Sequence, residues 1–384
     1  MRALFSCVSA YGHFHPLLPL ARALDDAGHE VAFAVAASFA PRVEAAGFSV
    51  LPAGIDQAER AARLAPVLEQ LETLPFDQRR TLAFNGNFSR IDAPAKLEEL
   101  RAAAGAWKPD LLVHDPCDLA GPIVAAELRI PSANHSFGRV IPLAVLERAE
   151  VETAALWRAA GLEPEPFAGE FRGLYLDICP PSFQTETFPA GARVQPLRPV
   201  FEPDPGDTLP DSVETLPERP TVYVTLGTVH NDLRVFRVLL AAIDGLECNA
   251  IVTIGRENDP SALEPLPENV VVERYIPQAL LLPRCDAVVS HGGSGSLLAT
   301  LAAGLPMLLV PQGADQFENA AHAAQIGAAK VLLPNELTED AVRAAVAGLL
   351  EDQSYRESAA RVAAEIAAMP PPEELVPALV EIAA

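Results

Sequence analysis

The stretch SHGGSGSLLATLAAG, residues 290–304, decides which fold this sequence is expected to adopt. An apolar run at 287–289 leads into a glycine-rich turn, and an apolar helical stretch follows over 297–303 and ends at Gly304. This order predicts a strand, a tight turn and a helix. Glycines let the backbone come close to a ligand, and the free N–H groups and dipole of a helix N-terminus favour an anion. The turn is therefore expected either to bind a phosphate or diphosphate, or to need glycines for its shape alone.

The start of the chain, residues 2–36, repeats this arrangement and is the clearest strand–helix–strand unit. Residues 3–8 are expected to form a buried strand, 11–15 a turn, and Pro16 the first position of a helix with leucines at helical spacing. Residues 31–35 form the next strand. The first ten residues could pass for a short secretory signal, but they lack a clear cleavage site, which favours a core strand.

Strand and helix signals alternate along most of the remaining chain, and this alternation predicts parallel, doubly wound sheets. Between about Asp56 and Ala106 the pattern is mostly helical, without strand signals. Further strands are expected at residues 48–51, 111–114, after Pro131, 221–226, 250–253, 270–272, 287–289 and 307–310.

Residues 198–220 interrupt the alternation, because six prolines and six acidic residues occupy 23 positions. Such a composition predicts an interdomain linker. We expect an N-terminal domain over residues 1–200, a linker over 199–219 and a C-terminal domain over 220–369, each large enough to bury its own core. A last amphipathic helix, over about 370–384, could pack back on the first domain. The predicted architecture is α/β, with two Rossmann-like domains facing a central cleft.

The composition excludes several classes of protein. Half of the residues are apolar and 21% are charged, which fits a globular enzyme or binding protein, and no apolar run is long enough to span a bilayer. The net charge of −23 argues against a nucleic-acid partner. The five cysteines are scattered, without a CxxC pair or a His/Cys cluster, which indicates a reducing cytoplasm and argues against structural zinc.

Two polar residues of the N-terminal half are expected at the ligand-binding edge of their sheet. In open α/β sheets, ligands bind at the carboxyl ends of the strands. His13 follows the first strand, and Asp115 follows the strand at 111–114. A histidine oriented by a carboxylate is a competent general base near neutral pH. The alternatives are a helix-capping role for His13 and a turn role for Asp115. His15 forms an HxH pair with His13, but we find no further ligands for a metal site.

Several loops of the C-terminal half are expected at the corresponding edge of their own sheet. The side chain of Tyr275 offers a flat face for a nucleobase, and the backbone at Ile276 could pair with the edge of the base. Asp315 and Gln316 suit hydrogen bonding to the vicinal hydroxyls of a sugar. The loops are Gly227-Thr228, Gly255-Arg256, residues 275–278, the HGGSGS turn and the PQGADQ segment. Together they predict a nucleotide, a diphosphate and a sugar, in that order.

Two stretches of the sequence resemble a known family. AYGHFHPLLPLARAL with GHEVAFA, and DAVVSHGGSGSLLATLAAGLPMLLVPQGADQFENA, resemble the GT-B nucleotide-sugar glycosyltransferases of family 1. The similarity covers essentially the whole chain and is strongest toward the bacterial natural-product branch, which decorates calicheamicin, other enediynes and macrolides. The resemblance implies an inverting transfer in a single displacement, without a metal ion.

The resemblance also implies a role for each matching position. His13 would be the base that deprotonates the acceptor hydroxyl, and Asp115 its carboxylate partner. The diphosphate would be held by His291, Gly292, Gly293, Ser294, Ser296 and Thr228, the nucleobase by Tyr275, Ile276 and Gln278, and the donor sugar by Asp315 and Gln316. Tyr275 stands where relatives often have tryptophan, and Ser296 where threonine is commoner. The first departure leaves the preferred base open.

The predicted function is the transfer of a (deoxy)sugar from a TDP- or UDP-sugar, TDP being favoured, to a hydroxyl of a small hydrophobic aglycone in antibiotic biosynthesis. No cofactor is expected beside this co-substrate. The acceptor pocket is expected to be lined by Phe76, Phe84, Phe88 and Phe137, and the protein to be a monomer or homodimer. The alternatives are a nucleotide-sugar epimerase and a non-catalytic nucleotide-sugar-binding partner. A nicotinamide dehydrogenase is disfavoured because no GxGxxG follows the first strand.

Overall fold

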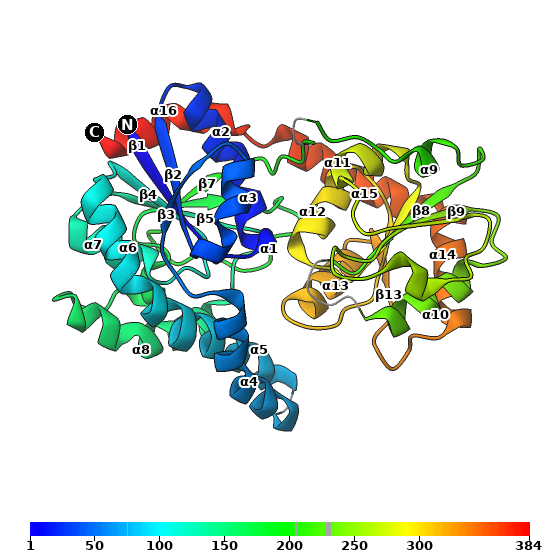
Figure 1. The fold of residues 1–384 in the computed structure, drawn as a ribbon, viewed down its shortest axis with the longest axis horizontal. Coiled ribbons are helices and arrows are strands. Elements are labelled where there is room, and N and C mark those ends of the chain that lie inside the picture. The colour runs from blue at the N-terminus through cyan, green and yellow to red at the C-terminus, as the bar shows by residue number, and fades with distance from the viewer. Residues whose placement is uncertain (75, 204–205, 228–231) are drawn as a thin grey trace. The chain divides into compact units, whose positions relative to one another are not determined.

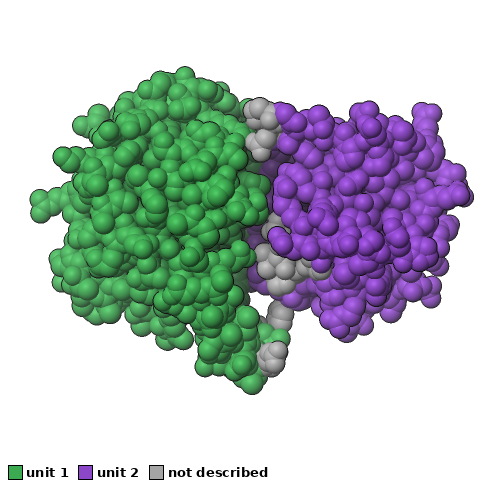
Figure 2. All heavy atoms as spheres, viewed as in Figure 1, with its two compact units in different colours: residues 1–179, 184–200, 369–384 green, residues 180–183, 201–368 purple. Residues whose placement is uncertain are grey.

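The chain divides into two compact units, shown by colour in Figure 2. Unit 1 comprises residues 1–179, 184–200 and 369–384, and unit 2 comprises residues 180–183 and 201–368. The structure is a computed structural model and describes residues 1–74, 76–203, 206–227 and 232–384, without the side chains of Glu72, Phe76 and Asp77.

Unit 1 is built on a parallel sheet that has seven strands in the described residues, in the order β3-β2-β1-β4-β5-β6-β7 (Figure 1). The strands are β1 (Arg2–Ser6), β2 (Glu30–Val35), β3 (Ser49–Pro52), β4 (Leu111–His114), β5 (Ser132–His135), β6 (Leu174–Asp177) and β7 (Arg193–Pro196). Helices cover both faces of this sheet. Leu4 packs in a cluster with Leu100 and Ile123 on one face, whereas Phe5 stacks on Phe33 on the other. Cover on both faces explains why the central strands are continuous apolar runs.

The helices of unit 1 include the predicted helical insert, which is found as α4, α5, η3 and α6. They are α1 (Tyr11–Phe14), η1 (His15–Leu17), α2 (Leu18–Asp26), η2 (Ala37–Phe39), α3 (Ala40–Ala45), α4 (Gln57–Thr73), α5 (Phe76–Phe84), the π-helical η3 (Asn85–Asp92), α6 (Ala93–Trp107), α7 (Gly121–Leu128), α8 (Leu143–Ala159), η4 (Pro166–Gly169) and α16 (Pro372–Ala383). The C-terminal helix α16 packs against α2, within unit 1.

One prediction for this unit is wrong. Residues 11–15 were expected to form a turn, but the helix begins at Tyr11. The N–H groups of His13 and Phe14 donate to the carbonyl oxygen of Ala10 at 3.1 and 3.0 Å, and the buried ring of Phe14 anchors the helix in the core. His13 therefore lies on a short helix rather than in an irregular loop.

Unit 2 has a second parallel sheet, with six strands among the residues described, in the order β10-β9-β8-β11-β12-β13. The strands are β8 (Thr221–Thr225), β9 (Asn249–Thr253), β10 (Val270–Glu273), β11 (Ala287–Ser290), β12 (Met307–Leu309) and β13 (Ala329–Val331). The helices are α9 (Asp211–Glu214), α10 (Leu233–Ile243), η5 (Pro260–Leu263), α11 (Gln278–Leu281), η6 (Leu282–Arg284), α12 (Ser294–Ala302), α13 (Gln316–Gln325), α14 (Glu339–Glu351) and α15 (Gln353–Ala368).

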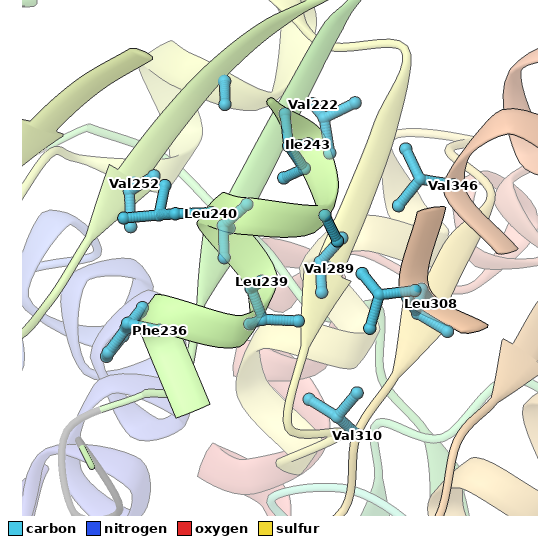
Figure 3. Close-up of a cluster of buried hydrophobic side chains, with 14 of the residues drawn as sticks. Val222, Phe236, Leu239, Leu240, Ile243, Val252, Val289, Leu308, Val310 and Val346 are labelled. Atoms are coloured by element: carbon cyan, nitrogen blue, oxygen red, sulfur yellow. The ribbon is translucent and has the colours of Figure 1, made fainter. Parts of the chain in front are cut away.

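The core of unit 2 shows how the sequence pattern builds this fold (Figure 3). Helix α10 buries one face, made of Phe236, Leu239, Leu240 and Ile243, at the spacing expected for an amphipathic helix. This face packs on strand residues including Val222, Val252, Val289 and Leu308, and Val346 of α14 joins the same cluster.

The proline- and acid-rich segment predicted as a linker is partly packed on unit 2. It contains the short helix α9, whose Val213 is buried. The hydroxyl of Ser212 donates to Glu273 of β10 at 3.2 Å. A segment with this composition thus includes an ordered turn that is fixed to the second unit.

All five cysteines are buried and carry free thiols: Cys7, Cys117, Cys179, Cys248 and Cys285. Within the described ranges, no helix combines the length and the apolar character needed to cross a membrane.

Candidate active site

The order of the strands gives each sheet one topological switch point. In unit 1 the successive strands β1, β2 and β3 are added on one side of β1, and β4 to β7 are added on its other side. In unit 2 the same change of side occurs between β8 and β11. Ligands bind outside the carboxyl ends of the strands at such switch points. His13 follows β1 and Asp115 follows β4, while Gly227 follows β8 and His291 follows β11.

His13 and Asp115 form a hydrogen-bonded pair in unit 1. Nδ1 of His13 lies 3.0 Å from Oδ1 of Asp115, and the side chains are 18% and 1% exposed. Because Nδ1 is engaged, Nε2 is the ring nitrogen that can receive a proton. His13 does not cap its helix, since the N-cap of α1 is Ala10.

The carboxylate of Asp115 is fixed by backbone as well as by the histidine. Oδ2 accepts from the N–H of Val8 and Oδ1 from that of Cys117, both at 2.8 Å. Burial acts to raise the pKa of Asp115, but His13 and the two N–H groups outweigh it and hold this pKa below its usual value. An ionised carboxylate at this position fixes the imidazole tautomer and stabilises the imidazolium.

Three of the four predicted acceptor aromatics gather around His13. The ring centroid of Phe137 lies 5.1 Å from that of His13, and the ring of Phe88 lies 5.9 Å away, both edge-on. Phe84 packs behind Phe88 at 5.0 Å. Phe88 belongs to the π-helical segment η3, and π-helical turns occur frequently at functional sites. The side chain of Phe76 lies outside the described residues.

The side chains of His13, Asp115 and Cys117 also have metal-ligating atoms within 4.8 Å of one another. However, Nδ1 of His13 and both oxygens of Asp115 already take part in hydrogen bonds inside the protein. Burial raises the pKa of the Cys117 thiol well above its usual value, which disfavours the thiolate that a metal requires. This group therefore suits proton transfer better than metal binding.

In unit 2, the HGGSGS turn has the predicted strand–turn–helix form. Gly292 has φ of +84°, which favours glycine, and Gly293 is the N-cap of α12. The His291 ring packs against two glycines, because a Cβ added at Gly227 or Gly293 would lie 2.6 or 2.4 Å from it. The packing of the His291 ring alone therefore explains why Gly227 and Gly293 carry no side chain.

Gly295 differs from its neighbours in this turn. It lies in the first turn of α12, and among the described residues an added Cβ would meet nothing within 4 Å. Glycine inside a helix costs about 1 kcal/mol relative to alanine, so neither backbone conformation nor packing explains it. The close approach of a ligand to the helix N-terminus would explain it.

The predicted sugar-binding residues are connected to this turn. Oδ2 of Asp315 accepts from the hydroxyl of Ser294 at 2.7 Å and from the amide of Asn319 at 2.9 Å. Asn319 also donates to the carbonyl oxygen of Gly292 at 3.0 Å. Gln316 is buried, and its Oε1 accepts from the N–H groups of Gln312 and Gly313 at 2.8 and 3.1 Å.

The predicted base-binding loop lies beside the same turn. Gln278 donates to the hydroxyl of Ser296 at 3.2 Å, so it links the loop to the start of α12. Tyr275 is 44% exposed, with the guanidinium of Arg256 4.0 Å from its ring centroid. Ile276 is buried, with 1% of the residue exposed. A pocket of about 470 Å³ is lined by Arg256, Pro260, Glu273, Arg274 and Tyr275. Thr228 lies outside the described residues.

Three residues that contact parts of this site were not predicted from the sequence. They are Asn319, Asp118, whose N–H donates to the carbonyl oxygen of Asp115, and Lys96, which forms an ion pair with Asp118. Asn319 lies in the quoted motif FENA, where its spacing from Asp315 could have indicated a shared helix face. Asp118 follows Asp115 by three residues, in the same segment between β4 and α7, and this closeness in sequence could have indicated it. Lys96 gave no signal, because a lysine in a helical pattern ordinarily lies on the exposed face.

Comparison with known proteins identifies the family of this chain. The family model "Erythromycin biosynthesis protein CIII-like, N-terminal domain" matches residues 22–227, and its C-terminal counterpart matches residues 237–382. An L-demethylnoviosyl transferase of Streptomyces niveus is 33% identical over 97% of this chain and 96% of its own length. A tylactone mycaminosyltransferase of Streptomyces fradiae is 30% identical over 100% of this chain and 93% of its own.

A solved structure extends the similarity to the whole fold. The structure of a spinosyn rhamnosyltransferase complexed with thymidine diphosphate has a TM-score of 0.79 and 25% identity, covering 99% of this chain and 100% of the other. The family predicted from the sequence is confirmed. The chain belongs to the erythromycin biosynthesis protein CIII-like family and is a GT-B glycosyltransferase of the family 1 natural-product branch.

Proposed function

We propose that the protein transfers a sugar from a TDP-sugar to a hydroxyl group of a small hydrophobic aglycone, with inversion at the anomeric carbon and without a metal ion. The observation that carries this proposal is the 3.0 Å contact between His13 and a buried, backbone-fixed Asp115. A module that only binds a nucleotide-sugar has no need of such a base.

The acceptor hydroxyl is activated at His13. Nε2 takes the hydroxyl proton as the oxygen attacks C1 of the sugar, and the bond between C1 and the diphosphate oxygen breaks in the same displacement. Asp115 stabilises the imidazolium that forms. A positioned base of this kind contributes about 10²- to 10⁴-fold to the rate. The edges of Phe88 and Phe137 give the acceptor an apolar surface beside the base.

The leaving diphosphate is held in unit 2 by the N-terminus of α12 together with His291. Free N–H groups at a helix N-terminus stabilise the developing negative charge, a task that a metal ion performs in other transferases. The missing side chain at Gly295 lets the phosphate approach those N–H groups. Ser294 and Ser296 add hydroxyl donors, and Ser294 exchanges its bond with Asp315 for one to the ligand.

The remainder of the donor is recognised by neighbouring loops. The base stacks on Tyr275, and the sugar hydroxyls bind Asp315 and the amide N–H groups of Gln316. Thymine is the favoured base because the spinosyn rhamnosyltransferase was solved with thymidine diphosphate.

A purified-protein screen of TDP- and UDP-sugars against a panel of aglycones tests this function. The expected product is a glycoside whose anomeric configuration, read from its NMR coupling constants, is opposite to that of the donor, formed equally well in EDTA. Retained configuration or loss of activity in EDTA would contradict the mechanism. An altered nucleotide-sugar formed without aglycone would identify an epimerase instead.

A further inference from the structure

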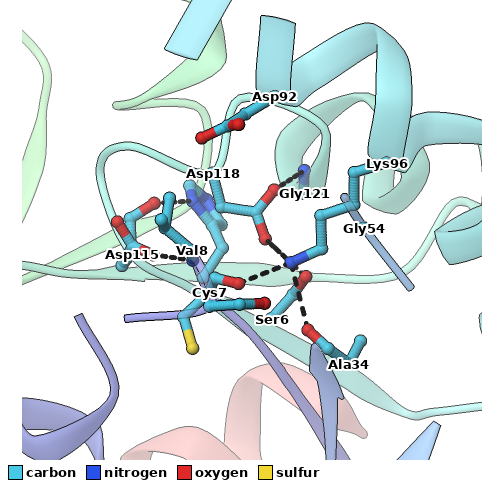
Figure 4. A network of polar contacts seen from close by, with 12 residues as sticks. Ser6, Cys7, Val8, Ala34, Gly54, Asp92, Lys96, Asp115, Asp118 and Gly121 are labelled. Carbon is cyan, nitrogen blue, oxygen red and sulfur yellow. Dashed lines mark hydrogen bonds and ion pairs between the residues drawn. The ribbon is translucent and has the colours of Figure 1, made fainter. Parts of the chain in front are cut away.

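A buried lysine lies behind the His13–Asp115 pair, and the mechanism proposed above does not use it. Lys96 of α6 has a side chain that is 7% exposed. Its Nζ donates to Oδ2 of Asp118 at 2.8 Å and to the carbonyl oxygens of Cys7 and Ala34 at 2.7 and 3.0 Å (Figure 4). A buried ammonium group is tolerated when its donors are satisfied, and these three acceptors use all three N–H bonds.

The three acceptors lie within or after three adjacent strands of the sheet. Ala34 lies in β2, Cys7 directly follows β1, and Asp118 lies in the segment after β4. Asp118 in turn accepts from the hydroxyl of Ser6 and from the N–H of Gly121 at the start of α7. The ion pair therefore joins the carboxyl ends of β2, β1 and β4, where the sheet presents its site.

One of these bonds is connected directly to the base. The carbonyl of Cys7 and the N–H of Val8 belong to the same planar peptide group. Lys96 holds the carbonyl side of that group, and its N–H side donates to Oδ2 of Asp115 at 2.8 Å. Rotation of the peptide group would remove the N–H of Val8 from the carboxylate. The N–H of Asp118 also donates to the carbonyl oxygen of Asp115 at 3.0 Å.

We infer that Lys96 and Asp118 are positioning residues: their ion pair fixes the peptide group between Cys7 and Val8 and so holds the carboxylate of Asp115 against His13. A buried ion pair is weak evidence for a stabilising role, because replacement of both partners by well-packed hydrophobic residues of similar volume is often neutral or stabilising. The effect of the ion pair on kcat rests on the proposed function, whereas its effect on the hydrogen bond between His13 and Asp115 does not.

Two variants separate positioning from folding. Lys96→Met leaves Asp118 charged and buried without its partner, so the thermal unfolding midpoint should fall. Lys96→Met with Asp118→Asn removes both charges. The amide oxygen keeps the bond from the N–H of Gly121, and the amide NH2 can donate to the hydroxyl of Ser6, so the midpoint should recover. If the ion pair positions the base, kcat of the double variant stays reduced by about 10- to 100-fold, because small misplacements of catalytic groups have effects of this size.

An NMR measurement on the protein without substrate reports directly on the hydrogen bond between His13 and Asp115. The proton between Nδ1 of His13 and Asp115 gives a low-field ¹H NMR resonance that is assigned by its absence in His13→Ala. In the double variant this resonance should move upfield or disappear through exchange. The matched control is Arg101→Met with Glu127→Gln, which removes another ion pair that joins α6 to α7, at 2.7 Å. This control should keep both the resonance and kcat.

A double variant with a recovered midpoint, wild-type kcat and an unchanged resonance would overturn the inference. A double variant that does not fold would overturn it as well, since the ion pair would then serve the fold. If the wild-type protein transfers no sugar, the proposed function fails, but the resonance still decides whether the ion pair positions the histidine.

Discussion

Replacing His13 by asparagine separates the two tasks of its imidazole. The side-chain N–H of asparagine can take the place of Nδ1–H, which lies 3.0 Å from Oδ1 of Asp115, so the carboxylate keeps all three of its donors. Nothing in the asparagine side chain replaces Nε2, the nitrogen assigned to receive the proton. The variant therefore keeps the hydrogen bond and loses the base.

The structure gives the size of both effects. The edge-on contacts of His13 with Phe137 and Phe88 are lost, and such pairs are worth about 0.5–1.5 kcal/mol each, so the free energy of unfolding falls by about 1–3 kcal/mol. Without the base, kcat falls about 10²- to 10⁴-fold, or about 3–5 kcal/mol of activation free energy. His13→Ala also loses the bond to the carboxylate, about 1.5–3 kcal/mol more in stability.

The assay compares steady-state kcat, the thermal unfolding midpoint and the Kd for TDP by calorimetry. The Kd should be unchanged, because the residues assigned to the donor belong to unit 2. An asparagine variant that keeps kcat within about threefold of wild type would refute the reasoning. His13 would then be a structural partner of Asp115, and another group would take the proton.

Three further predictions test the donor site and a buried acid. Gly295→Ala should keep or raise the unfolding midpoint but weaken TDP binding. Gly293→Ala should lower the midpoint, because its Cβ would lie 2.4 Å from Nε2 of His291. Undiminished TDP affinity in Gly295→Ala would exclude the assigned diphosphate position. Tyr275→Ala should weaken TDP binding, measured by calorimetry, by about 1–3 kcal/mol, the value of one stacked base, and Tyr275→Trp should bind TDP as the wild type does. Equal TDP affinities of Tyr275→Ala and wild type would rule out stacking. Burial raises the pKa of Asp177 from 3.8 to about 6, so the folded state binds this proton more tightly and loses stability as the pH rises between these values. Relative to wild type, the free energy of unfolding of Asp177→Asn should therefore rise by about 2.4 kcal/mol from pH 4 to pH 8. A constant difference in urea titrations would contradict this.

The parts of the fold that the sequence predicted are those encoded by local patterns. The strand–turn–helix at residues 290–304 combines an apolar run, glycines and helical spacing within 15 positions, so its form was predictable. The rule for switch points then brought His13 and Asp115 to one edge. The strands β6, β7 and β13 were not predicted. Of these, β7 and β13 lie at the edges of their sheets and are partly exposed, so neither shows a continuous buried apolar run.

The parts that were not predicted depend on contacts between distant segments. Lys96 is buried because its ammonium group reaches the carbonyl oxygens of Cys7 and Ala34 and the carboxylate of Asp118, which come from distant segments, and no local pattern records this. Asn319 likewise acquires its partners only when α13 packs beside the turn at Gly292. Both residues contact groups that the motifs indicated, but no motif indicated the residues themselves.

The burial of all five cysteines has a practical consequence. Burial raises the pKa of every one of these thiols, so none is both exposed and ionised at neutral pH. A cysteine introduced at an exposed position, such as Val151 of unit 1 or Leu333 of unit 2, would therefore react selectively with a maleimide dye. A donor dye at one position and an acceptor dye at the other would report, through energy transfer in single molecules, how the distance between the units responds to TDP, with every native cysteine left in place.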